Sequence, residues 1–142
     1  LKGEVAGVRI LDDYAHHPDE LRQSIASVRA LYPGRRLTVV FQPHLYSRTR
    51  DFAPQFAEAL DTADEVVLID LYPAREEPIP GISSKTIFDK LNCPHKSMIS
   101  KENFVDTMKN SNFEILLTAG AGDLNLYVPQ LVRALRTPDG CN

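Results

Sequence analysis

The chain has 142 residues, of which 43% are apolar and 25% are charged, and its formal net charge is −3. This length corresponds to about one domain with its own hydrophobic core, and the composition is ordinary for a globular protein. The slightly acidic balance does not indicate a nucleic-acid partner. No apolar run is long enough to span a membrane, and no signal peptide is recognisable. Two cysteines, Cys93 and Cys141, cannot form a disulfide framework and lack metal-ligand spacing, so we expect a cytoplasmic protein.

Short apolar runs alternate along the chain with stretches whose apolar residues recur at helical spacing. We expect strands at residues 2–6, 8–11, 37–42, 65–71, 96–100 and 113–117. We expect helices around residues 18–31, 52–60, 83–91, 104–108 and 127–135. The first two strands would pair antiparallel through Gly7. The pattern therefore predicts a three-layer α/β/α domain of the Rossmann-like kind, whose six-stranded mixed sheet has five parallel strands and one antiparallel edge strand.

Several residues mark the expected helix boundaries. Pro18 suits the first turn of the first helix, because proline lacks the N–H that would find no partner there. Ser83 or Ser84 is a suitable cap for the third helix. Asn125 is a plausible cap for the last helix, since that boundary places Pro129 within the first turn, where it is tolerated.

The end of the third apolar run carries the most informative segment. Residues 41–50 read Phe-Gln-Pro-His-Leu-Tyr-Ser-Arg-Thr-Arg, and Pro43 ends the preceding strand. A loop at the carboxyl end of a strand is where open α/β sheets bind ligands. Arg48 and Arg50 in such a loop suggest a carboxylate or a phosphate, because the guanidinium group matches the geometry of both. The alternative is a solvated helix start with ordinary surface arginines.

A second strand end carries two carboxylates and two imidazoles, on Asp12, Asp13, His16 and His17. These groups could hold a divalent metal or act as acid and base near neutral pH. Their spacing fits no closed zinc pattern, however. The alternative is that His17 and the acids cap the helix that Pro18 opens.

A third strand end is the small-residue turn Gly120, Ala121 and Gly122. Its backbone N–H groups could face an anion or a substrate. The turn does not match the dinucleotide-binding fingerprint, because Asn125 stands where that motif has glycine, and no Gly-Lys-Ser/Thr follows as in a P-loop. A plain tight turn between strand and helix is the alternative.

Taken together, these segments resemble the C-terminal domain of the Mur ligases. Four motifs occur in that family in the order found here: Asp-Asp-Tyr-Ala-His-His-Pro, Phe-Gln-Pro-His-x-Tyr-Ser-Arg-Thr, Tyr-Pro-Ala-Arg-Glu-x-Pro-Ile-Pro-Gly and Gly-Ala-Gly. The resemblance runs over residues 1–135. The first motif is shared with the murein peptide ligases of cell-wall recycling. The second is typical of the branch that adds L-alanine to UDP-N-acetylmuramate in peptidoglycan biosynthesis.

The resemblance implies that residues 1–142 are the last of three domains of a cytoplasmic, ATP-dependent ligase. The N-terminal domain of such an enzyme binds UDP-N-acetylmuramate, and the central domain binds ATP and Mg²⁺ on a P-loop. The C-terminal domain receives the amino acid. On this basis we expect the isolated domain to bind no cofactor tightly and to be inactive, with no catalytic residue or metal ligand assigned to it.

The resemblance also implies roles for individual residues. The L-alanine pocket would be formed by Arg48, His44, Tyr14 and His16. Asp13 would approach the ribose of ATP when the domains close. Leu45 departs from the family, because some relatives have an arginine there, and this leaves more of the carboxylate binding to Arg48, with Arg50 as a possible helper.

Other interpretations stay open at this point. Tyr72, Arg75 and Glu76 match a family motif, but a proline-stiffened structural loop explains them equally well. The chain could also be a free-standing module that binds amino acids or anions. A further alternative is a metal-assisted hydrolase that uses Asp12, Asp13, His16 and His44.

Overall fold

A computed structural model of the chain describes residues 3–5, 8–13, 17–72, 75–111, 113–120 and 124–136. Within these ranges the side chains of residues 3–5, 8, 9, 12, 13, 125 and 136 are not described. The strands are β1 (Gly3–Val5), β2 (Val8–Asp13), β3 (Leu37–Phe41), β4 (Glu65–Ile69), β5 (Lys96–Ile99) and β6 (Ile115–Ala119). The helices are α1 (Pro18–Leu31), α2 (Tyr46–Leu60), α3 (Ser84–Phe88), α4 (Phe104–Lys109) and α5 (Val128–Arg136), with short 3₁₀ turns η1 (Lys101–Asn103) and η2 (Leu124–Leu126).

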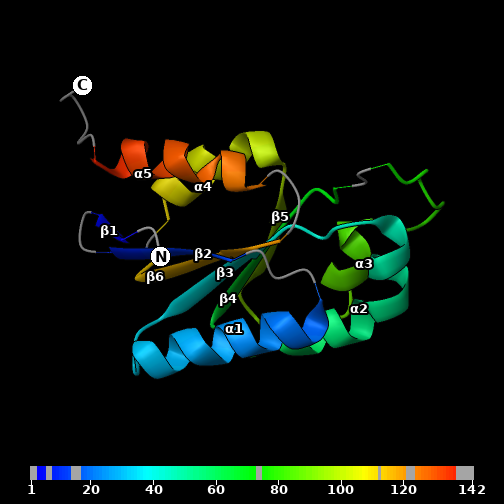
Figure 1. Cartoon of the computed structure of the whole chain (residues 1–142), viewed down its shortest axis with the longest axis horizontal. Coiled ribbons are helices and arrows are strands. Elements are labelled where there is room, and N and C mark those ends of the chain that lie inside the picture. The colour runs from blue at the N-terminus through cyan, green and yellow to red at the C-terminus, as the bar shows by residue number, and fades with distance from the viewer. Residues whose placement is uncertain are drawn as a thin grey trace.

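The strands form one sheet in the order β1-β2-β6-β3-β4-β5. Strands β2, β6, β3, β4 and β5 are parallel to one another, and the short β1 pairs antiparallel with β2 at the edge. Helices α1, α2 and α3 lie on one face of the sheet, and α4 and α5 lie on the other (Figure 1). The predicted three-layer α/β/α class with five parallel strands is therefore confirmed.

A hydrophobic cluster lies on each face of the sheet. The strand β3 contributes to both, because alternate side chains of a strand point to opposite faces. Val39 and Phe41 pack with α1 and α2, whereas Val40 packs with α4 and α5. Every residue of β3 is buried, which explains why its sequence is apolar except for Thr38 instead of alternating.

The carboxyl ends of β2, β6 and β3 lie side by side. In the pairing register, Ala119 at the end of β6 stands opposite both Asp13 of β2 and Phe41 of β3. The three strand ends with unusual residues are therefore neighbours. We call this side the carboxyl edge of the sheet, and the opposite side, where the parallel strands begin, the amino edge.

Some boundaries differ from the prediction. Helix α2 begins at Tyr46, so Ser47–Arg50 form its first turn and not a loop. Strand β6 begins two residues later than predicted, at Ile115, whose N–H bonds the carbonyl of Arg36 just before β3. Asn125 lies inside η2, three residues before α5 begins and thus not at its N-cap position, although Pro129 does fall in the first turn of that helix. Within the described part of the chain, no helix combines the length and apolarity needed to cross a membrane.

Candidate anion site at the carboxyl edge

Gly120 and Gln42 join the ends of β6 and β3. Gly120 has a φ of +138°, and a Cβ atom there would lie 2.7 Å from the carbonyl oxygen of Gln42. The Gln42 side chain is buried, and its Oε1 accepts a hydrogen bond of 2.8 Å from the N–H of Leu124. Only glycine allows this close approach of two backbones. For Gly120 this geometry supports a tight structural turn, whereas Ala121 and Gly122 lie outside the described residues.

The turn between β3 and α2 is held by the segment that follows β4. The N–H of Leu45 donates to the carbonyl of Tyr72, and the N–H of Tyr72 donates to the carbonyl of Pro43, both at 2.8 Å. The rings of His44 and Tyr72 stack with their centroids 5.8 Å apart. Leu45 adopts a φ of +70°, which is rare for a residue with a branched side chain. The β3–β4 pairing thus continues past the ends of both strands.

Helix α2 receives its cap from a distant residue. Leu45, at the N-cap position, provides no side-chain hydrogen bond. The carboxylate of Glu76 instead accepts the backbone N–H of Ser47 at 2.9 Å and also accepts the Ser47 hydroxyl. These hydrogen bonds lower the pKa of Glu76, with smaller contributions from a hydrogen bond of the Tyr46 backbone and from the charge of Arg50. A carboxylate at this position suits the positive end of the helix.

Arg48 lies in the first turn of α2 and is half-buried. Its Nη1 atom is fully shielded from solvent and has no hydrogen-bond partner among the residues that the structure describes. A guanidinium stays charged at any physiological pH, and a buried donor without a partner is unfavourable. Arg50, by contrast, is exposed and donates from Nε to Asp51 at 2.9 Å. Of these two arginines, only Arg48 has a buried donor without a partner among the described residues.

His17 caps α1, as the structural alternative predicted. Its Nδ1 accepts the backbone N–H of Asp19 at 3.3 Å, and its ring packs 5.3 Å from that of Phe52. Tyr14 and His16 lie outside the described residues, and the side chain of Asp13 is not described. Among the side chains that are described, no three His, Cys, Asp or Glu residues gather as a metal site would require.

A cavity of about 550 Å³ opens beside this region, at the carboxyl ends of β4 and β5. Its wall includes Tyr46 at the start of α2, Asp70 after β4, Ser83 and Ser84 at the start of α3, and Ser100 after β5. Ser83 caps α3, as predicted, by accepting the N–H of Lys85. The carboxyl edge is therefore hollowed next to the turn that carries Arg48.

The structure is an open α/β domain whose sheet carries, at its carboxyl edge, an arginine nitrogen without a partner among the described residues, and such edges are where α/β domains bind ligands. Residues 1–130 match the family model of the Mur ligase, glutamate ligase domain, and the chain belongs to this family. It is 56% identical over 125 residues to a UDP-N-acetylmuramate–L-alanine ligase of Phocaeicola vulgatus, an alignment that covers 87% of this chain and 27% of that protein. The chain thus spans about a quarter of the length of such curated relatives.

Solved structures agree with this assignment. The fold matches a UDP-N-acetylmuramate-alanine ligase from Thermotoga maritima with a TM-score of 0.69 and 26% identity, over 93% of this chain and 29% of that one. A murein peptide ligase from Psychrobacter arcticus matches with a TM-score of 0.75 over 94% of this chain and 28% of that one. At 16% identity, the second match shows the fold alone.

Proposed function

We propose that this chain is the amino-acid-binding C-terminal domain of a UDP-N-acetylmuramate–L-alanine ligase, an ATP-dependent enzyme of peptidoglycan biosynthesis. The proposal draws on the 56% identity to such a ligase. The structural observation that carries it is the buried Nη1 of Arg48, which has no partner among the described residues. The murein peptide ligases are a second candidate, supported by the match in fold, but their similarity in sequence is much lower.

In the proposed reaction, the carboxylate of UDP-N-acetylmuramate is first phosphorylated, because a free carboxylate is a poor electrophile. The amine of L-alanine then attacks the acyl phosphate. A C–N bond forms, the C–O bond to phosphate breaks, and the amine loses a proton. ATP would supply the phosphoryl group, and Mg²⁺ would balance its charge. The proposal places both on the central domain of the ligase, since the present sequence has no Gly-Lys-Ser/Thr loop.

In this proposal, the present chain positions L-alanine for its attack on the acyl phosphate. Arg48 would bind the carboxylate of L-alanine and leave its amine aimed at the acyl phosphate, which is an entropic contribution to catalysis. We further propose that His44, Tyr14 and His16 line the same pocket. Asp13 would approach the ribose of ATP when the domains close. We also propose that the enzyme is cytoplasmic, because its nucleotide substrates are found in the cytoplasm.

The test of this proposal is the kinetics of Arg48 variants of the full-length ligase. Arg48→Ala should lower kcat/KM for L-alanine about 10- to 100-fold, because charge-assisted bonds contribute roughly 1.5–3 kcal/mol and each 1.4 kcal/mol is about tenfold. Arg48→Lys should restore little, since an ammonium group cannot form the two parallel hydrogen bonds of a guanidinium.

Arg50→Ala is the matched control, because Arg50 lies two residues further along the same helix and is engaged by Asp51. We expect its saturation curve for L-alanine to be close to that of the wild type. Near-normal curves for Arg48→Ala as well would contradict the proposed site.

A further inference from the structure

Glu76, in the loop that follows β4, binds the first turn of α2, although it lies 29 positions after Ser47 in the sequence. The carboxylate of Glu76 accepts both the N–H and the hydroxyl of Ser47. The N–H groups of a helix's first turn have no partners within the helix, and the N-cap residue usually supplies one. Here the N-cap residue Leu45 supplies none. Glu76 therefore caps α2 through a tertiary contact, in place of the residue at the N-cap position.

The same loop also contacts the turn that precedes α2, through Tyr72. Tyr72 exchanges backbone hydrogen bonds with Pro43 and Leu45, and its ring stacks on His44. The chain from Pro43 to Ser47 is thus held at both ends by residues that follow β4. This attachment keeps Leu45 at its φ of +70°, a conformation that the surrounding contacts must impose on a leucine.

Arg48 is the residue next to this attachment, and its buried Nη1 has no partner among the described residues. Both oxygens of Glu76 are engaged by Ser47, one by its backbone N–H and the other by its hydroxyl. We propose that Glu76 is a positioning residue, whose bonds to Ser47 fix the first turn of α2 and thereby aim Arg48 at the carboxylate of the amino acid. This inference rests on the proposed function, since it concerns how that site is built.

The consequence is a specific kinetic effect. A shift of about 1 Å in a positioning group can lower the rate of an enzyme by about a hundredfold. In the full-length ligase, Glu76→Ala should raise KM for L-alanine by about tenfold or more. The values of KM for ATP and UDP-N-acetylmuramate should change by less than about twofold, because other domains bind those substrates. Glu76→Gln keeps an oxygen that can accept the Ser47 N–H, so its effect should be clearly smaller.

Glu77→Ala is the matched control. Glu77 is the neighbouring carboxylate, it is exposed, and no hydrogen bond or ion pair links it to the rest of the described chain. We expect wild-type kinetics for this variant. A similar rise in KM for L-alanine in Glu77→Ala would overturn the proposal, because it would show a general effect of charge on the loop.

The double variant Arg48→Ala/Glu76→Ala separates positioning from a merely structural role. If Glu76 acts through Arg48, the double variant should have the same KM for L-alanine as Arg48→Ala alone. Effects that multiply would overturn the proposal. Should Glu76→Ala fail to fold, Ser47→Ala removes one of the two bonds without a change of charge, and we expect KM for L-alanine to rise about threefold.

Failure of this inference differs from failure of the proposed function. An active wild-type ligase whose Glu76→Ala and Ser47→Ala variants keep the wild-type KM for L-alanine would overturn the inference and leave the function standing. A wild-type enzyme whose release of phosphate does not depend on L-alanine would overturn the proposed function and, with it, the inference.

Discussion

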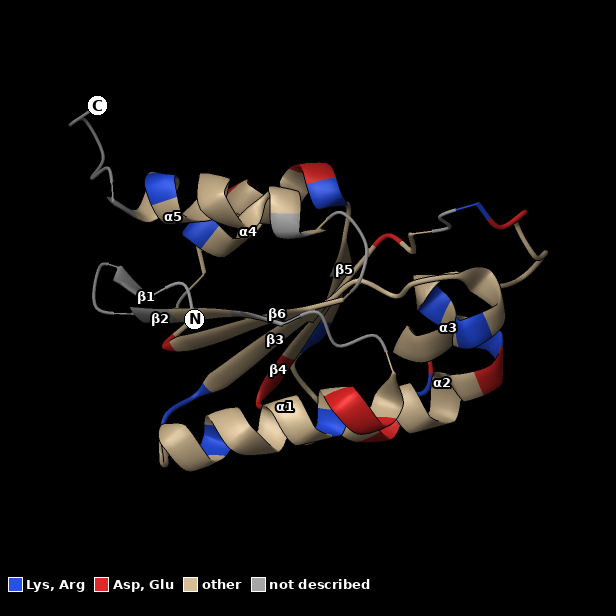
Figure 2. Ribbon diagram, viewed as in Figure 1, with Lys and Arg blue, Asp and Glu red and all other residues tan. Residues whose placement is uncertain are grey.

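Three arginines whose side chains the structure describes lie at the amino edge of the sheet, and two lie at the carboxyl edge near the start of α2. Each of the three at the amino edge has a carboxylate partner: Arg29 with Asp64 at 3.2 Å, Arg35 with Glu114 at 2.6 Å and Arg36 with Glu65 at 3.4 Å. Figure 2 shows charges of both signs at the starts of β3, β4 and β6. At the carboxyl edge, Arg50 pairs with Asp51, whereas Arg48 pairs with no described residue.

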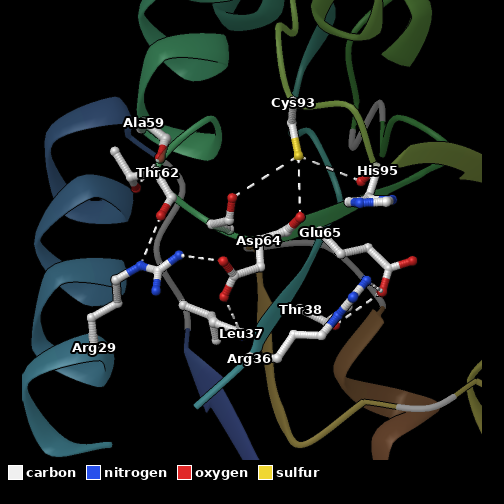
Figure 3. A network of polar contacts seen from close by, with 11 residues as sticks. Arg29, Arg36, Leu37, Thr38, Ala59, Thr62, Asp64, Glu65, Cys93 and His95 are labelled. Atoms are coloured by element: carbon white, nitrogen blue, oxygen red, sulfur yellow. Dashed lines mark hydrogen bonds and ion pairs between the residues drawn. The ribbon is translucent and has the colours of Figure 1, made fainter. Parts of the chain in front are cut away.

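The amino edge is a network of contacts within the domain (Figure 3). Asp64 accepts the N–H of Leu37 at 2.8 Å as well as the guanidinium of Arg29, which itself donates to the carbonyl of Thr62. The thiol of Cys93 lies 3.4 Å from the carbonyl of Asp64 and 3.5 Å from that of His95. These contacts tie the beginnings of β3, β4 and β5 together.

The difference indicates what each arginine does. Arg36 also has one buried nitrogen without a partner, its Nε, but Glu65 compensates its charge. Charges that are balanced within the domain stabilise the strand starts, whereas we propose that Arg48, whose charge no described residue balances, binds an external anion. We therefore expect substitutions at the amino edge to change stability and substitutions of Arg48 to change kinetics.

The largest effect on stability should, however, come from the carboxyl edge, at the backbone contact beneath the site. Gly120→Ala places a Cβ atom 2.7 Å from the Gln42 carbonyl at a φ of +138°. We expect it to lower the free energy of unfolding by about 3 kcal/mol or more, since both backbone strain and a clash oppose it. Denaturation by urea measures this change.

Gly81→Ala is the control that measures the cost of backbone strain alone, without a steric clash. Gly81 also has a positive φ, +81°, but nothing lies within 4 Å of the position that an added Cβ atom would take. We expect it to cost only about 1 kcal/mol. Equal effects of the two substitutions would show that the close approach of Gly120 to Gln42 is unimportant.

A smaller effect is expected at the amino edge. Asp64→Ala removes the acceptor of the Leu37 N–H, and we expect it to lower the free energy of unfolding by about 1–2 kcal/mol. The ion pair with Arg29 adds little, because both groups are partly exposed. In the full-length ligase, KM for L-alanine should be unchanged. A raised KM would contradict the division of roles between the two edges.

The effect of Asp64→Ala should also depend on pH. Burial raises the pKa of Asp64, but the hydrogen bond from Leu37 and the charge of Arg29 outweigh it, so that the pKa is lowered. A carboxyl group with a lowered pKa in the folded state stabilises the fold above its unfolded pKa, about 3.9, and loses that contribution as the pH falls further. The stability difference between wild type and variant should therefore be constant above about pH 5 and shrink below about pH 4.

Much of the fold follows from local sequence. Apolar runs located all five parallel strands, and the residue types at their ends showed which edge to examine. Pro18 stands in the first turn of α1, as predicted, and of the two interpretations of His17 the structure shows the cap. Of the two serines offered as a cap for α3, Ser83 is the one that serves. The resemblance to the Mur ligases is confirmed by the family match. These features depend on neighbours in sequence or on motifs, so they are accessible without a structure.

The start of α2 was predicted too late because its cap is not local. A sequence shows Leu45 before Tyr46, which is a poor N-cap, and the actual acceptor, Glu76, follows 29 residues after Ser47. Gln42 was missed for a similar reason, since its partner Leu124 is 82 residues away. A glutamine directly before Pro43, at the end of a buried strand, was the available signal. Contacts of this kind require the fold to be known.

The most direct test of the account is a crystal structure of the full-length ligase with UDP-N-acetylmuramate, a non-hydrolysable ATP analogue and L-alanine. We predict that the guanidinium of Arg48 binds the carboxylate of L-alanine with two hydrogen bonds of about 2.7–2.9 Å, one of them from Nη1. A carboxylate held by other residues, with Nη1 of Arg48 still lacking a partner, would contradict the account.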